Sequence, residues 1–219
     1  YMPQRIHRLS DEFFANMSSM SFHDVAYNVA SAFFGEDTDL DVLQDLVRDT
    51  LSFPVPLVRV TDRIYSLELF HGPTLAFKDV GARFMARLLS FFIRQNPCSD
   101  ARGEVNVLVA TSGDTGSAVD NGFLGVPGIH VYVLYPKGKV SPIQECQFTT
   151  LGQNITAVEV DGTFDDCQRL VKSAFMDETL NAHMRLTSAN SINVARFLPQ
   201  AFYYFNAVAR VAPQGGTGG

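Results

Sequence analysis

The feature that most constrains the fold is an alternation of strand-like and helix-like segments between residues 104 and 209. Short runs of valine, leucine and isoleucine predict strands over 105–110, 130–135 and 155–160, with a shorter one near 185–187. The segments that follow these strands predict helices over 116–123, 142–150, 164–175 and 192–209. Strands that are apolar on both faces and joined by helices are typical of parallel sheets. The sequence therefore predicts an α/β fold with a parallel, doubly wound sheet.

The residues before this alternation predict a helical segment. Ser21 precedes apolar residues at helical spacing and Gly35 follows them, so we expect a capped helix between the two. A second helix is expected over 39–51. The sequence Phe53-Pro54-Val55-Pro56 then marks a boundary, because proline interrupts helices. Beyond it we expect a strand over 64–70 and an apolar helix over 80–94.

Composition narrows the classes of function. The 219-residue chain carries a net charge of −6 and contains no long block of Lys or Arg, which argues against a nucleic-acid partner. No apolar run is long enough to cross a bilayer. The three cysteines are scattered without CxxC or metal-ligand spacing, so we expect reduced thiols, a cytoplasmic location and no bound metal.

One lysine has unusual sequence surroundings. Residues 71–79 read H-G-P-T-L-A-F-K-D, which places Lys78 directly after the apolar step Leu75-Ala76-Phe77. A lysine in such a setting either extends its amine to water or is reactive. This stretch alone does not decide between the two.

Two strand-to-helix junctions are candidate anion sites. The first reads A-T-S-G-D-T-G over 110–116, and free backbone N–H groups at a helix start favour an anion. An ordinary helix cap explains it equally well, and it matches neither a phosphate-binding P-loop nor the dinucleotide G-x-G-x-x-G. The second junction spans 190–196, where Asn190, Asn193 and Arg196 fall on successive turns of one helix face. Its alternative is a capped helix with a solvated arginine.

Lys137 and Lys139 follow the end of a third predicted strand and could add positive potential there. Solvated loop lysines are the simpler interpretation. Among the histidines, only His71 lies near a candidate site.

Four stretches together resemble one enzyme family. They are E-L-F-H-G-P-T-L-A-F-K-D over 68–79, A-T-S-G-D-T-G-S-A-V over 110–119, L-Y-P-K-G-K-V-S-P-I-Q-E over 134–145 and S-A-N-S-I-N-V-A-R over 188–196. In this order they closely resemble the bacterial and fungal-type threonine synthases. The resemblance implies a pyridoxal 5'-phosphate enzyme with the tryptophan-synthase-β-like fold, which is fold type II.

The resemblance also implies roles for individual residues. Lys78 would be the catalytic lysine that holds the cofactor as a Schiff base, and Phe77 and Asp114 would also contact the cofactor. The turn formed by Ser112, Gly113, Asp114 and Thr115 would hold the substrate α-carboxylate, with Asp114 standing where related enzymes often carry Asn. The substrate phosphate would be bound by Asn190, Ser191 and Arg196.

The implied reaction converts O-phospho-L-homoserine and water to L-threonine and phosphate, in a monomer or weak homo-oligomer. Two other interpretations stay open: a threonine synthase-like phospho-lyase that releases a keto acid, and a truncated product that only binds a partner.

The resemblance further predicts how the chain is divided. We expect an N-terminal helical region over 1–53, the Schiff-base lysine segment of the large domain over 54–100, a small α/β domain over 101–211 and a linker or loop over 212–219. Threonine synthases continue into a Gly-rich S-G-N-F-G-like loop that binds the cofactor phosphate, which this sequence does not contain. We therefore expect a large domain that is incomplete at both ends and a chain that is inactive by itself.

Overall fold

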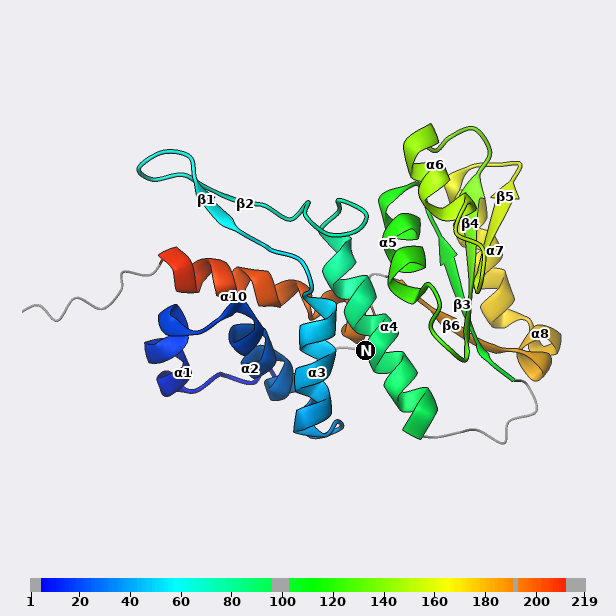
Figure 1. Cartoon of the computed structure of the whole chain (residues 1–219). Helices are drawn as coiled ribbons and strands as arrows, with labels where there is room; N and C mark the ends of the chain where they lie inside the picture. Colours follow the sequence, from blue (N-terminus) through cyan, green and yellow to red (C-terminus); the bar gives the residue numbers. More distant parts are fainter. Residues whose placement is uncertain (1–4, 96–102, 191–192, 212–219) are drawn as a thin grey trace, which may run out of the picture.

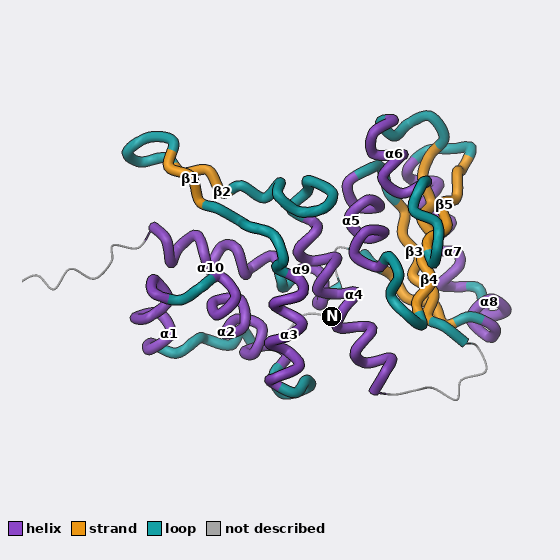
Figure 2. Tube along the Cα trace, viewed as in Figure 1, coloured by secondary structure: helices purple, strands orange, loops and turns teal. Residues whose placement is uncertain are grey.

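The computed structural model describes residues 5–95, 103–190 and 193–211. Figures 1 and 2 show a mostly helical part beside a part built around a parallel sheet. The elements in chain order are α1 (Asp11–Asn16), η1 (Met17–Ser19), α2 (Phe22–Phe34), α3 (Leu40–Thr50), β1 (Leu57–Arg59), β2 (Tyr65–Leu67), α4 (Lys78–Gln95), β3 (Val105–Ala110), α5 (Asp114–Phe123), β4 (Ile129–Pro136), α6 (Pro142–Thr149), β5 (Ile155–Val160), α7 (Phe164–Met176), α8 (Glu178–His183), β6 (Arg185–Ser188), α9 (Val194–Phe197) and α10 (Gln200–Val211).

The sheet has the order β5-β4-β3-β6, and all its strand pairs are parallel. Strand β3 lies inside the sheet, where Val107 is opposite Val131 of β4 and Thr187 of β6. Helix α5 covers one face of the sheet and α7 the other (Figure 1). This arrangement confirms the predicted parallel, doubly wound sheet. It also brings the carboxyl ends of β3 and β6 to one edge, from which both candidate junctions start.

Helix α4 is a wall shared by two hydrophobic cores. Val80, Phe84 and Leu88, spaced at i and i+4, pack with the helices α1, α2, α3 and α10 in the first core. Ala82, Met85 and Ala86 face the other way, into the core beneath the sheet. The first residue of α4 is Lys78, so the shared wall carries this lysine to the junction between the two cores.

Two glycines let backbones approach closely around α4. A Cβ at Gly122 of α5 would lie 3.0 Å from the carbonyl carbon of Ala82, and one at Gly81 would collide with the carbonyl oxygen of Arg196. Only glycine accommodates such contacts, so α5 and α9 can both lie directly against the first turns of α4.

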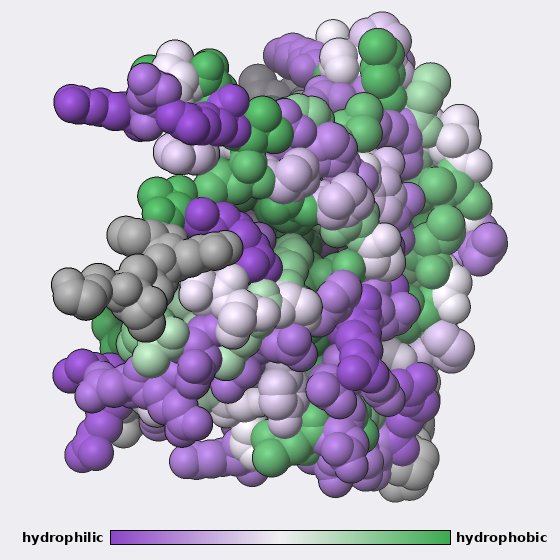
Figure 3. All heavy atoms as spheres, turned by 60° about the vertical axis from the view of Figure 1, so that its left-hand side comes forward, coloured by the Kyte–Doolittle hydropathy of each residue, from purple (hydrophilic) through white to green (hydrophobic). Residues whose placement is uncertain are grey.

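The antiparallel hairpin of β1 and β2 projects from the helical part (Figure 1). Figure 3 turns this side of the molecule forward and shows hydrophobic side chains interspersed with hydrophilic ones. Val60 and Ile64, near the tip of the hairpin, are 62% and 59% exposed.

Several predicted boundaries were wrong. Helix α4 begins two residues earlier than expected, and the expected strand over 64–70 is only the three-residue β2. The helix expected over 192–209 is two helices, α9 and α10, because Pro199 between them cannot donate the N–H that a continuous helix requires. The short elements α1, α8 and β1 were missed, since six or fewer residues give too little periodicity to recognise.

The predicted division into regions stays a prediction. Helices α9 and α10 pack mainly in the first core, although they follow the sheet in the sequence. The predicted linker over 212–219 lies outside the described residues.

Candidate functional site

Lys78 points its amine at the start of the neighbouring helix α5. Its Nζ donates a hydrogen bond of 3.0 Å to Oγ1 of Thr115. Loss of solvent around the partly buried amine lowers the pKa of Lys78; Asp114 opposes this effect and Arg196 adds to it. The sequence left open whether this lysine is solvated or reactive, and this environment favours the neutral, nucleophilic amine.

The loop before Lys78 is fixed by a buried carboxylate. Asp79 is 1% exposed and accepts hydrogen bonds from the backbone N–H (2.9 Å) and the hydroxyl (2.6 Å) of Thr74. These bonds close a tight turn in which Leu75 has a φ of 60°, a conformation that costs energy for a residue with a side chain. A Cβ at Gly72 would strike the same carboxylate. Hydrogen bonds to Asp79 therefore keep the backbone before Lys78 in this strained conformation.

The apolar step before Lys78 does not enclose the amine. Leu75 is 68% exposed and Phe77 is 46% exposed. Phe77 keeps one contact with the amine, whose Nζ lies 5.8 Å from the ring centroid. The turn at Leu75 directs this step outward, so the residues that flank the amine come from α5 and α9.

The turn between β3 and α5 is organised by Thr111. This buried hydroxyl accepts hydrogen bonds from the N–H groups of Gly113 (3.0 Å) and Gly116 (2.7 Å) and donates one to the carbonyl of Gly113 (3.0 Å). Gly113 has a φ of 147°, which requires glycine. The turn leaves Ser112 and Asp114 exposed, and the Asp114 carboxylate accepts a hydrogen bond from Gln144 of α6.

Within the part of the chain that the structure describes, Arg196 is a buried cation without a carboxylate partner. It is 3% exposed, and among the described residues its only side-chain hydrogen bond runs from Nη1 to the carbonyl oxygen of Ala189. Burial lowers the pKa of this guanidinium to about 10. A guanidinium carries five N–H donors, and a buried charge is normally paired. The unpaired donors of Arg196 therefore favour an external anion.

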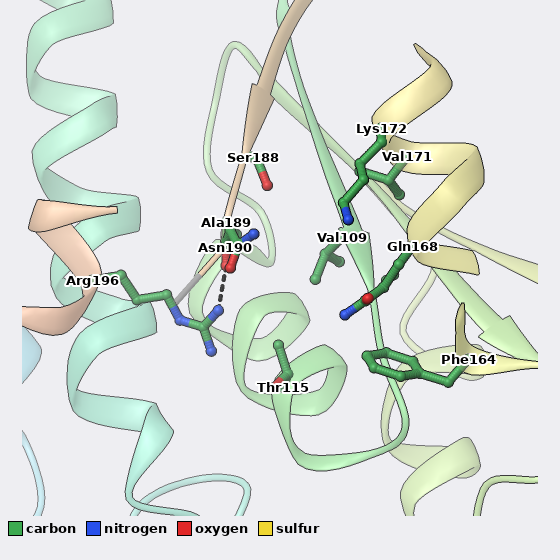
Figure 4. Close-up of a pocket in the computed structure, with 11 residues that line it drawn as sticks. Val109, Thr115, Phe164, Gln168, Val171, Lys172, Ser188, Ala189, Asn190 and Arg196 are labelled. Atoms are coloured by element: carbon green, nitrogen blue, oxygen red, sulfur yellow. Dashed lines mark hydrogen bonds between the residues drawn. The ribbon is translucent and has the colours of Figure 1, made fainter. Parts of the chain in front are cut away.

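Figure 4 shows a cavity of about 260 Å³ at the edge where β3 and β6 end. Ala110 and Thr115 of the first predicted junction line it, as do Asn190 and Arg196 of the second, so the structure brings the two junctions together. No carboxylate lines the cavity among the described residues. The Arg196 guanidinium lies beside Ala189 and Asn190, and Thr115 lies below it in this view.

Other predicted residues lie elsewhere or outside the description. Ser112, Gly113 and Asp114 do not line this cavity, and Ser191 falls outside the described residues. Lys137 and Lys139 are exposed. The Nε2 of His71 donates a hydrogen bond of 2.7 Å to a carboxylate oxygen of Glu68.

Sequence reasoning missed several residues that shape the site. Thr111 and Gln144 lay inside quoted motifs but carried no signal that separated them from their neighbours. Asp79 was noted only as the residue after Lys78, although an aspartate near a Gly-Pro turn is a common hydrogen-bond acceptor for backbone N–H groups. The contribution of α7 to the cavity wall was missed because only the folded sheet brings that helix near 110 and 190.

No helix within residues 5–95, 103–190 and 193–211 has the length and apolarity to cross a bilayer. Over the same ranges, no group of three or more His, Cys, Asp or Glu is placed to hold a metal ion.

Comparison with known proteins gives consistent matches. A family profile described as "Threonine synthase N terminus" matches residues 1–51. Threonine synthase of Escherichia coli is 48% identical over 195 residues, which are 89% of this chain and 44% of that protein.

Two solved structures are also similar. The crystal structure of the Escherichia coli threonine synthase matches with a TM-score of 0.85 at 45% identity, over 96% of this chain and 48% of that one. A structure of threonine synthase from Brucella melitensis with bound PLP matches with a TM-score of 0.88 at 36% identity, over 98% of this chain and 47% of that one.

Fold and site together define an α/β protein that sets a lysine amine and a buried guanidinium at the carboxyl edge of a parallel sheet. This chain spans about half the length of the relatives it matches. Over that stretch it closely resembles the threonine synthases, and its fold is the type II fold that the sequence predicted.

Proposed function

We propose that this chain contributes the lysine and the substrate-phosphate site of a threonine synthase, which converts O-phospho-L-homoserine and water to L-threonine and phosphate. The observation that carries the proposal is the hydrogen bond from Lys78 to Thr115, a residue that also lines the cavity in which the buried cation Arg196 has no carboxylate partner among the described residues. A phosphomonoester supplies the anion that this cation lacks.

The residues around Lys78 fit pyridoxal phosphate. A Schiff base requires a neutral amine, and the lowered pKa of Lys78 supports that state. Phe77 and Asp114 lie close enough to the amine to interact with it and would contact the same group. When bound, pyridoxal phosphate withdraws electrons from the substrate α-carbon. The Lys78 amine would carry protons at the substrate α and β carbons.

The substrate would span the two junctions. Ser112, Gly113, Asp114 and Thr115 would receive the α-carboxylate at the start of α5, where backbone N–H groups are free. Asn190, Ser191 and Arg196 would bind the phosphate. Thr115 of the first junction accepts a hydrogen bond from Lys78 and lines the same cavity as Arg196 of the second, so both ends of one small substrate would be held near the amine.

The protein's setting follows from the same proposal. We infer a small-molecule substrate, a cytoplasmic location and a monomer or weak homo-oligomer, with neither nucleic acid nor membrane as a partner. Because the chain spans about half the length of its relatives, we propose that turnover requires a polypeptide of their length.

The test separates the lysine from the arginine. Arg196→Ala and Lys78→Ala are compared with the unchanged chain for trapping of pyridoxal phosphate by borohydride and for calorimetric binding of methyl phosphate. We expect Lys78→Ala to abolish trapping but retain methyl phosphate binding. We expect Arg196→Ala to retain trapping but bind methyl phosphate about 10- to 100-fold more weakly, as for a lost charge-assisted contact.

Two results would refute the proposal. A trapped product on another lysine after Lys78→Ala would show that Lys78 is not the attachment site. Loss of cofactor trapping in Arg196→Ala, with methyl phosphate binding unchanged, would show that the wrong phosphate had been assigned to Arg196.

A further inference from the structure

Helix α7 forms the wall of the cavity opposite Arg196. Its residues Phe164, Gln168, Val171 and Lys172 line the cavity, and their spacing of three and four places them on one helix face. In Figure 4 the side chains of Gln168 and Lys172 extend from α7 toward the strand that carries Val109.

One cation does not neutralise a phosphomonoester. Its second pKa is about 6, so it carries nearly two negative charges at neutral pH. Arg196 supplies one positive charge, and Lys78 is committed to the cofactor if the proposed function is correct. Lys172 is the remaining cation on the cavity wall among the described residues, in a chain whose net charge is −6.

We propose that Lys172 binds the substrate phosphate from the α7 side and makes the site selective for the dianion, with the Gln168 amide as a neutral donor beside it. The inference rests on the proposed function, because it assigns a further residue to the same phosphate. Arg196 would bind the anion through its fixed, planar donors, whereas the flexible lysine would complete its neutralisation from the opposite wall.

The same helix provides a matched control. Arg169 lies three residues before Lys172, is paired with Asp166 at 2.7 Å and does not line the cavity. Replacing it removes one positive charge from α7 without removing one from the cavity wall. A change in general electrostatic attraction would affect both variants equally, whereas a direct contact affects only Lys172.

The experiment measures calorimetric binding of methyl phosphate to the chain and to Lys172→Gln, Lys172→Arg and Arg169→Gln. Titrations at about pH 5 and about pH 8 lie on either side of the probe's second pKa of about 6. We expect Lys172→Gln to weaken binding about tenfold at the higher pH and clearly less at the lower one. Lys172→Arg should retain most of the affinity, and Arg169→Gln should match the unchanged chain at both pH values.

Equal affinities for Lys172→Gln and Arg169→Gln would overturn the inference. If Arg196→Ala still weakened binding in that case, the proposed function would stand without Lys172. A loss in Lys172→Gln of the same size at both pH values would overturn selectivity for the dianion. Absence of methyl phosphate binding to the unchanged chain at millimolar concentration would overturn this inference together with the assignment of Arg196.

Discussion

Asp120 should make the stability of this protein fall as pH rises. This residue of α5 is 0% exposed, and neither of its carboxylate oxygens has a hydrogen-bond partner among the described residues. Burial raises its pKa from 3.8 to about 8. The folded state therefore keeps a proton that the unfolded state loses, so the stabilising effect of that proton is complete below the unfolded pKa and disappears as pH approaches the folded pKa.

The magnitude follows from the pKa difference. Between the two pKa values, each pH unit removes about 1.4 kcal/mol from the free energy of unfolding. From about pH 5 to about pH 7 the free energy of unfolding falls by about 3 kcal/mol. Domains usually have a free energy of unfolding of roughly 5–15 kcal/mol, so this loss is a large part of the total. Asp166, whose pKa is lowered by Arg169 and Thr163, changes its charge only at lower pH and does not contribute to this slope.

The assay is urea unfolding of the chain and of Asp120→Asn at several pH values between these limits. The amide is nearly the same size as the carboxyl but does not titrate, so we expect the variant to lose the downward slope. Asp161→Asn, at an exposed position, is the control and should keep it. Parallel pH profiles for the unchanged chain and Asp120→Asn would refute the argument.

Three further predictions concern the backbone and the amine of the site. Lys78→Arg should fail to trap pyridoxal phosphate with borohydride, because guanidinium cannot form an imine; trapping by this variant would contradict the role of the amine. Thr111→Val should destabilise the chain in urea by roughly 1–3 kcal/mol for each orphaned N–H, Gly113 and Gly116, and an unchanged midpoint would show that these bonds do not hold the turn. Gly81→Ala should force α9 away from α4, cost roughly 1–3 kcal/mol and weaken methyl phosphate binding through Arg196; unchanged stability and affinity would show that the close approach is unnecessary.

Sequence reasoning recovered the sheet well because its signal is local and repeated. Strand β3 lies over the residues expected for it, and Ser21 caps α2 as expected, since both depend on apolar spacing and cap chemistry that lie within a few residues. The split between α9 and α10 also has a local signal, which is Pro199. The apolar pattern continues on both sides of this proline, and for that reason one continuous helix was predicted.

The site was predicted less completely because much of it depends on contacts between distant residues. The resemblance assigned Lys78, Thr115, Asn190 and Arg196 to one site, and the structure brings them to one edge of the sheet. Periodicity could not predict that the side chains of Leu75 and Phe77 point to solvent. Their direction depends on a turn that hydrogen bonds between Thr74 and the Asp79 carboxylate hold in place. Burial of Arg196 arises likewise from the packing of α9 on Gly81, and the wall formed by α7 arises from the topology of the sheet.

The most direct test of the account is product analysis with O-phospho-L-homoserine. The assay uses these residues joined to the remaining part of the Escherichia coli relative, with cofactor absorbance as the check that the joined protein holds pyridoxal phosphate. We expect L-threonine and inorganic phosphate in equal amounts, and loss of both in Arg196→Ala while the cofactor absorbance persists. Release of phosphate with a keto acid in place of threonine, or no phosphate release from protein that holds its cofactor, would contradict the proposed function.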